Sequence, residues 1–162
     1  MEALQQAIAS RPNLHAMTFA ADSTTGVADF ARRVTGAHPS LAALVNDAGI
    51  MRFAVLDRAR DLADAEATIT TNLPGPIRLT DALIEHLIRQ PDAALVNVTS
   101  GPAFVPLVAT PPYPATKAAM HGCTSRGAET QARGDRAGVL RLMIIAEAWA
   151  PAQPRVRAGR SV

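Results

Sequence analysis

The sequence is poor in the residues that build disulfide frameworks, metal sites and aromatic cores. Its 162 residues include one cysteine, one tryptophan, one tyrosine and four phenylalanines. The single cysteine, Cys123, excludes an internal disulfide and any cysteine-rich metal site. The four histidines are His15, His38, His86 and His121. They are not spaced as metal ligands, so we expect no metal site. With aromatic residues at 4%, the core must be built mainly from Ala, Val, Leu and Ile.

Long apolar runs and a strong net charge are also lacking. No stretch reaches the roughly 18 apolar residues that a membrane span needs, and the N-terminus has no signal-peptide pattern. The formal net charge is only +2, and the excess is too small and scattered to favour nucleic acid. The chain is 48% hydrophobic and 19% charged, which is typical of a globular domain. We therefore expect a soluble, cytoplasmic protein that binds neither nucleic acid nor membranes.

Apolar spacing along the chain alternates between helical and extended patterns. Helical spacing predicts helices over three stretches: residues 1–10, residues 23–35 with a cap at Ser23, Thr24 or Thr25, and residues 61–86 with an interruption at 73–76. Short apolar runs predict strands at residues 14–19, 41–45, 93–99 and 139–146. This alternation predicts parallel βαβ units. We expect one α/β domain over residues 1–146, followed by an irregular arginine-bearing tail over residues 147–162.

The most informative stretch is residues 100–117, which holds the only tyrosine and the only lysine. Tyr113 and Lys117 are four residues apart, so a helix would place them on one face. A free phenol has a pKa of about 10 and moves protons poorly at neutral pH, but a neighbouring ammonium favours the phenolate. Ser100 lies thirteen residues before Tyr113, at the carboxyl end of a predicted strand, where open α/β sheets place ligands. Because Pro114 follows directly, we expect Tyr113 at the very start of its helix.

This arrangement, a strand-end serine followed thirteen residues later by Tyr-x-x-x-Lys, resembles the short-chain dehydrogenase/reductase family. The sequence Asn-Asp-Ala-Gly-Ile at residues 46–50 is similar to the family's Asn-Asn-Ala-Gly turn, with Asp47 in place of the second asparagine. Residues 71–80 resemble the helix that carries the family's catalytic asparagine, which falls here on Asn72. Within the family, residues 72–119 are most similar to the bacterial DltE-like subgroup.

The resemblance implies an α/β fold with a partial Rossmann-like, doubly wound parallel sheet. It also implies an NAD(P)-dependent oxidoreductase that interconverts a small-molecule carbonyl and an alcohol, with NAD or NADP as cofactor. Tyr113 would then be the general acid or base, and Lys117 would support it and bind the nicotinamide ribose. Ser100 would hold the substrate oxygen, and Asn72 would anchor a water in a proton relay. The implied cofactor-binding residues are Asn46, Asp47, Ala48, Gly49, Tyr113 and Lys117.

The sequence departs from the family at both ends. The Gly-rich loop that cradles pyrophosphate at a helix N-terminus has no counterpart here, and the family's first two strands would be absent. Without those neighbours, residues 14–19 would either move beside the next strand or detach. The sequence also diverges after about His121, because residues 125–136 are polar with no apolar face. A frameshift in the coding DNA is one hypothesis for the divergence after His121. A misplaced start codon is one hypothesis for the missing Gly-rich loop.

Three functional interpretations stay open on these residues. The first is an oxidoreductase that, as this fragment, binds dinucleotide weakly or not at all. The second is a non-catalytic interaction module that pairs with a full-length relative. The helices expected around Asn72 and Tyr113 would then form the subunit contacts, as they would in a homo-oligomer. The third is a product without function.

Overall fold

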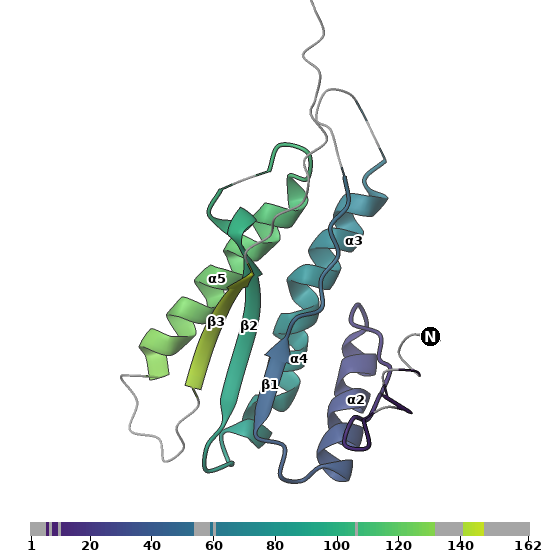
Figure 1. Cartoon of the computed structure of the whole chain (residues 1–162), viewed down its shortest axis with the longest axis vertical. Helices are drawn as coiled ribbons and strands as arrows, with labels where there is room; N and C mark the ends of the chain where they lie inside the picture. Colours follow the sequence, from purple (N-terminus) through teal and green to yellow (C-terminus); the bar gives the residue numbers. More distant parts are fainter. Residues whose placement is uncertain are drawn as a thin grey trace, which may run out of the picture.

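A computed structural model describes residues 6, 8–9, 11–53, 59, 61–105, 107–131 and 141–147. Its elements are, in order, α2 (Thr24–Ala37), β1 (Ala43–Asn46), α3 (Ala63–Asn72), α4 (Pro74–Leu87), β2 (Ala94–Ser100), a short 3-10 helix (Gly101–Ala103), α5 (Pro112–Gln131) and β3 (Arg141–Glu147) (Figure 1). The strands lie in the order β1-β2-β3, and both neighbouring pairs are parallel. The predicted α/β class and parallel sheet are therefore confirmed.

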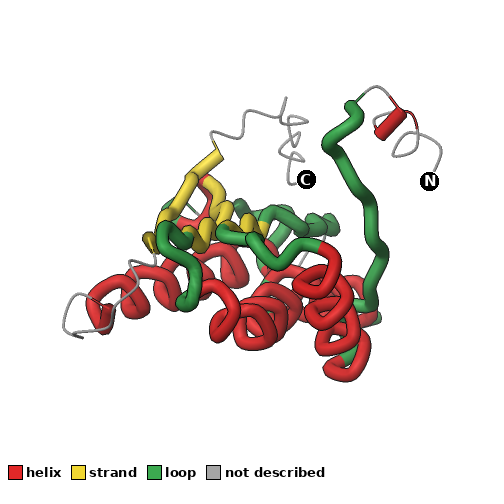
Figure 2. Tube along the Cα trace, turned by 90° about the horizontal axis from the view of Figure 1, so that it is seen from below, coloured by secondary structure: helices red, strands yellow, loops and turns green. Residues whose placement is uncertain are grey.

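The hydrophobic core lies between the sheet and one layer of helices (Figure 2). Leu44 and Leu95 are partners in the β1–β2 register, and both pack into a cluster with buried residues of α2 and α4: Val27, Ala31, Leu79, Leu83 and Leu87. Val45, the next residue of β1, points to the opposite side and is 57% exposed. A doubly wound sheet has helices on both faces. The described residues supply only one such layer, so the doubly wound part of the prediction is not seen in them.

The helix boundaries follow from local capping chemistry. Among the three predicted caps for α2, the structure selects Ser23, whose Oγ accepts a hydrogen bond from the Gly26 N–H at 3.1 Å. The predicted interruption of the long helix is also confirmed, because α3 ends at Asn72 and α4 begins at Pro74. Proline at the first helical position lacks an N–H that would have no partner there anyway, so it starts α4 without cost.

The strand predicted over residues 14–19 is wrong. These residues form an irregular segment, and within the described part of the chain β1 pairs only with β2. Instead of joining the sheet, Phe19 stacks on Phe30 of α2 with a ring-centroid distance of 4.5 Å. A strand without a hydrogen-bonded neighbour gains little, whereas stacking one aromatic ring on another removes part of its apolar area from water. Of the two alternatives for this segment, detachment is the one observed.

The remaining predictions fall near or outside the described residues. The predicted helix over residues 1–10 lies largely outside them, although Gln6, Ile8 and Ala9 are helical. The strand expected at residues 139–146 is β3, shifted by one or two residues. α5 continues to Gln131, so the polar stretch that begins at residue 125 is helical in its first part despite lacking an apolar face. The tail beyond residue 147 lies outside the described residues.

Candidate active site

The start of α5 brings the only tyrosine and the only lysine together. Tyr113 is the second residue of the helix, as expected, and its N–H donates to the Thr110 carbonyl at 3.0 Å. Lys117 Nζ lies 5.8 Å from the centroid of the Tyr113 ring. Lys117 is only 6% exposed, and its ammonium donates to the Val98 carbonyl of β2 at 2.8 Å. A buried charge is costly unless it is hydrogen-bonded, so this bond helps to hold the ammonium at the carboxyl end of β2.

Asn72 clamps the loop that follows β1. Its side chain is 2% exposed at the end of α3. Oδ1 accepts from the Ile50 N–H at 2.8 Å, and Nδ2 donates to the Ile50 carbonyl at 2.8 Å and to Thr116 Oγ1 at 3.3 Å. Thr116 precedes Lys117 in α5, so Asn72 links the β1 loop to the helix that carries the lysine. The relay role expected for Asn72 stays a prediction, and the contacts show a positioning role.

Gly49 allows this loop to approach the lysine closely. A methyl group in place of its hydrogen would lie 3.4 Å from Asn72 Oδ1 and 3.5 Å from Lys117 Nζ. Those distances are ordinary contact for one carbon, but a larger side chain would have to displace one of the two groups. Gly49 therefore lies beside the Lys117 ammonium, and cofactor binding by Asp47, Ala48 and Gly49 stays a prediction.

Asn46 takes part in a buried hydrogen-bond network. It is buried at the end of β1, and its Nδ2 donates to Thr80 Oγ1 of α4 at 3.2 Å and to Asn97 Oδ1 of β2 at 2.8 Å. Asn97 Nδ2 in turn donates to Thr124 Oγ1 of α5 at 2.8 Å. These bonds join two strands to two helices beneath the sheet. Direct cofactor contact by Asn46 stays a prediction; its observed partners are structural.

The sequence contains a signal for this network. The tetrapeptide Ala-Leu-Val-Asn occurs both as β1 and at residues 94–97 of β2, and the two copies pair residue for residue. Identical strands in parallel register place their asparagines side by side, where one amide can donate to the other. Two matching strand sequences that end in asparagine therefore predict such a pair.

Ser100 and Thr110 are the buried hydroxyl residues at the two ends of the loop before α5. Ser100 is the last residue of β2 and is 1% exposed. The loop rises from that strand end and returns to the start of α5 (Figure 1), so Ser100 and Tyr113 share the carboxyl edge of the sheet. Thr110 is also 1% exposed, and its Oγ1 makes no hydrogen bond within the described structure. Sequence reasoning did not single out Thr110, and no pattern marks it.

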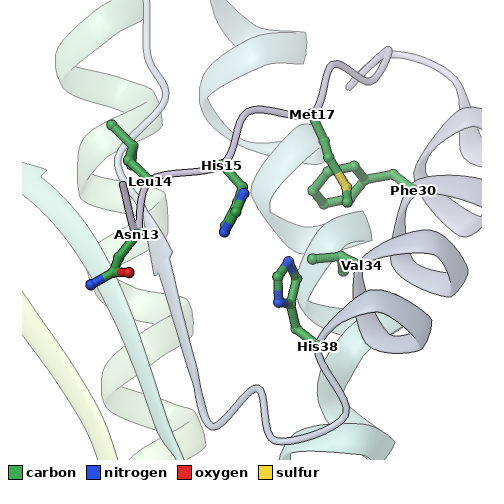
Figure 3. A pocket seen from close by; sticks show the side chains of 7 residues that line it. All are labelled: Asn13, Leu14, His15, Met17, Phe30, Val34 and His38. Atoms are coloured by element: carbon green, nitrogen blue, oxygen red, sulfur yellow. The ribbon is translucent and has the colours of Figure 1, made fainter. Parts of the chain in front are cut away.

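A hollow of about 550 Å³ lies elsewhere, between the irregular segment and α2 (Figure 3). His15 and His38 face each other across it with ring centroids 5.5 Å apart. Its lining contains none of the predicted site residues: Asn13, Leu14, His15, Met17, Phe30, Val34 and His38. The hollow exists because residues 13–17 lie over α2 instead of extending the sheet. It is therefore separate from the candidate active site.

In the part of the chain that the structure describes, neither a metal-binding cluster of three or more side chains nor a membrane-spanning helix occurs. No group of three or more His, Cys, Asp or Glu side chains there could hold a metal ion. No helix there is both long and apolar enough to cross a membrane.

The described residues fit one end of a nicotinamide dinucleotide better than the other. The ammonium of Lys117, the Tyr113 ring and the open backbone at Gly49 lie together at the sheet edge, which suits a ribose bearing hydroxyl groups. The sequence has no Gly-rich strand–turn–helix to cradle the pyrophosphate. The fit is therefore to the nicotinamide-ribose end.

Comparison with known proteins settles the family. The family model described as short chain dehydrogenase matches residues 1–143. This chain belongs to the short-chain dehydrogenase family. The uncharacterized oxidoreductase DltE of Bacillus subtilis is 42% identical over 86 residues, which cover 52% of this chain and 34% of DltE. The predicted family, including its DltE-like subgroup, is thus confirmed.

Solved structures show the same fold. A short-chain dehydrogenase from Streptomyces avermitilis matches with a TM-score of 0.76 at 23% identity, covering 88% of this chain and 51% of that one. A gluconate 5-dehydrogenase from Burkholderia cenocepacia, in complex with NADP and tartrate, matches with a TM-score of 0.69 at 26% identity, covering 79% and 48%. The chain spans a third to a half of the length of these relatives.

Proposed function

We propose that this chain carries the proton-transfer and substrate-binding half of an NAD(P)-dependent oxidoreductase that interconverts a carbonyl and an alcohol. The observation that supports this most strongly is the pairing of Tyr113 and Lys117 at the carboxyl edge of a parallel sheet. Each is the only residue of its kind in the chain. The family membership supplies the reaction class.

The proposed chemistry assigns one step to each side chain. The nicotinamide cofactor, when bound, supplies or accepts the hydride. The Tyr113 hydroxyl gives its proton to the substrate oxygen in carbonyl reduction, and its phenolate takes a proton from the alcohol in oxidation. The buried ammonium of Lys117 stabilises the phenolate by its charge. Ser100 orients the substrate oxygen by hydrogen bonding, and Asn72 keeps the Ile50 loop in place beside Lys117.

NAD or NADP is the proposed cofactor, since the gluconate 5-dehydrogenase relative holds NADP. Lys117 would hold the nicotinamide ribose, and the turn at residues 46–49 would also contact the cofactor. Because these 162 residues contain no phosphate cradle, we propose that the chain binds dinucleotide only weakly, so that turnover needs millimolar cofactor. Isothermal titration with NADP(H) and NAD(H) measures this directly, and a micromolar dissociation constant would falsify the expectation.

A second candidate function is a non-catalytic module that pairs with a full-length relative. Two observations favour it: the outer edge of β1 has no strand partner among the described residues, and Val45 is exposed on the face without helices. Unpaired edges invite pairing with another chain. This candidate predicts co-purification with a co-expressed full-length relative, and it predicts that Tyr113→Phe changes nothing.

Turnover separates the two candidates. NADPH and NADH are supplied at millimolar concentration, to offset weak binding, with a panel of ketones. The oxidoreductase proposal expects slow cofactor oxidation that depends on ketone and falls by at least about 100-fold in Tyr113→Phe. Turnover that Tyr113→Phe leaves intact would refute it.

A further inference from the structure

His15 and His38 are brought together by the packing of the irregular segment on α2. The two residues are far apart in the sequence, and their spacing gave no sign of a metal site. In the structure their rings point toward each other from opposite walls of the hollow, with centroids 5.5 Å apart and planes inclined by 36° (Figure 3). His15 lies in the irregular segment, and His38 is the C-cap residue of α2. The pair therefore joins two parts of the chain that no strand pairing connects.

The nitrogens of this pair have no other task in the described structure. No hydrogen bond to another described residue holds either ring, whereas His86 Nε2 lies 3.1 Å from the Leu41 carbonyl oxygen. His15 is exposed and His38 is partly exposed, so a solvated ion can reach both rings. Neutral imidazole is the commonest metal ligand in proteins. Two such rings that face each other offer two nitrogen donors to one ion.

The donor set of the hollow selects one class of metal. No Asp, Glu, Lys or Arg side chain is among the described residues that line it. Mg²⁺ and Ca²⁺ need oxygen ligands, chiefly carboxylates, and find none there. Imidazole nitrogen suits Zn²⁺ and its transition-metal neighbours. No cationic side chain of the lining repels such an ion.

The separation of the two rings suits a tetrahedral zinc ion. An imidazole nitrogen binds Zn²⁺ at about 2.0–2.1 Å, which places the ring centroid roughly 3 Å from the metal. Two imidazoles on one tetrahedral ion then have centroids roughly 5 Å apart. The observed separation is 5.5 Å, so small side-chain rotations bring both rings into place. Asn13 points away from the pair (Figure 3), which leaves the remaining positions to water.

We propose that His15 and His38 form a two-histidine site for Zn²⁺ that fastens the irregular segment to α2. Both ligands come together only in the folded chain, so binding of the ion stabilises this packing. The proposal goes beyond the oxidoreductase function, because the site contains none of the candidate catalytic residues. The metal has a structural role and takes no part in the reaction.

Titration of the full chain with zinc tests the proposal. The protein carries Cys123→Ser, because an exposed thiol also binds zinc, and it has no histidine tag. Isothermal titration should show one Zn²⁺ per chain with a dissociation constant below about 0.1 mM, and no binding of Mg²⁺. In NMR spectra the ring protons of His15 and His38 should shift together with added zinc, while those of His86 stay unchanged.

Single substitutions in the same background locate the site. His15→Ala and His38→Ala each remove one of the two ligands, so the affinity for Zn²⁺ should fall by at least about tenfold. His15→Cys restores a zinc ligand at an exposed position and should recover the affinity. His86→Gln is the control, because the His86 ring already has the Leu41 carbonyl as a partner, and it should keep the affinity of the unchanged chain. Circular dichroism confirms that each variant is folded.

Three results would overturn the proposal: no zinc binding up to about 1 mM, binding that both alanine variants retain, and equal affinity for Zn²⁺ and Mg²⁺. The second result would mean adventitious binding elsewhere on the chain. The proposed function fails separately, since Tyr113→Phe should bind zinc as the unchanged chain does. Zinc binding without Tyr113-dependent turnover would remove the enzyme and leave the metal site, and turnover without zinc binding would do the reverse.

Discussion

Asn72 shows most clearly what a single residue does beyond its motif. The family resemblance implies an amide that holds a water behind the lysine, and this role stays a prediction. The structure shows the amide paired with both backbone groups of Ile50 and with Thr116. Such pairing makes the side chain part of the scaffold around Lys117. An asparagine that satisfies a loop backbone in this way mimics a strand neighbour, since it donates to and accepts from the same residue.

The clamp leads to a stability prediction for Asn72→Leu. The substitution is close in size but leaves the Ile50 N–H and carbonyl without their partner, which should cost about 1–3 kcal/mol of unfolding free energy. Urea unfolding measures the loss, and hydrogen exchange of the Ile50 amide should accelerate. Asn13→Leu, at an exposed position, is the control and should change stability by no more than about 0.5 kcal/mol. Unchanged exchange at Ile50 would show that the clamp contributes nothing.

For Thr110 we predict a substitution that raises the unfolding free energy. Its Oγ1 is buried and makes no hydrogen bond within the described structure, and a buried hydroxyl without a partner is destabilising. Thr110→Val keeps the shape and removes that hydroxyl, so it should raise the unfolding free energy by about 1 kcal/mol. Thr110→Ser, which keeps the hydroxyl, should not. A loss of stability in Thr110→Val, seen in thermal unfolding, would mean that a water or ligand holds the hydroxyl.

Sequence spacing predicted some of these residues and not others. Tyr113 and Lys117 follow from a four-residue helical spacing, which holds in any helix. Thr116 and Thr110 could not be predicted, because a hydroxyl finds its partner through tertiary packing and carries no periodic signal. The Asn46–Asn97 pair could have been predicted in part, because the tetrapeptide Ala-Leu-Val-Asn occurs in both strands.

At the scale of elements, local chemistry sets the helix boundaries. The N-cap of α2 offers a direct test, because Ser23 Oγ accepts from the Gly26 N–H. Ser23→Ala should lower the unfolding free energy by about 1 kcal/mol. Ser40→Ala, at an exposed turn position, is the matched control. Equal urea midpoints for the two variants would contradict the capping role.

Elements that depend on distant partners were predicted less well. The strands at residues 43–46 and 94–100 were found because continuous apolar runs are typical of buried parallel strands. The segment at residues 14–19 is interrupted by His15 and Thr18 and lacks a neighbouring strand, and it packs on α2 instead. Strand formation is decided by pairing as well as by propensity. The break between α3 and α4 needed no partner, so the Leu-Pro-Gly-Pro stretch at residues 73–76 predicted it.

At the scale of the molecule, the two sides of the sheet differ. One side carries α2, α4 and α5 over the core, and the other leaves Val45 exposed. The relatives are two to three times as long as the matched part of this chain. The family and fold could be predicted from the Ser100–Lys117 motif, whereas the one-sided arrangement depends on which neighbours the sheet has.

The candidate catalytic side chains lie together at the carboxyl edge of the sheet. It carries Tyr113, Lys117 and the Asn72 clamp, and no comparable grouping occurs elsewhere in the described structure. The account therefore depends on this edge moving a proton while hydride is transferred.

Deuteride transfer tests that claim most directly. The chain is incubated with NADPH deuterated at the reactive carbon of the nicotinamide and with 2-octanone, and the product is analysed by mass spectrometry. We predict deuterium on the carbinol carbon of 2-octanol, formed by the unchanged chain and reduced by at least about 100-fold in Tyr113→Phe. Deuterated alcohol formed equally by both proteins, or by neither, would contradict the account.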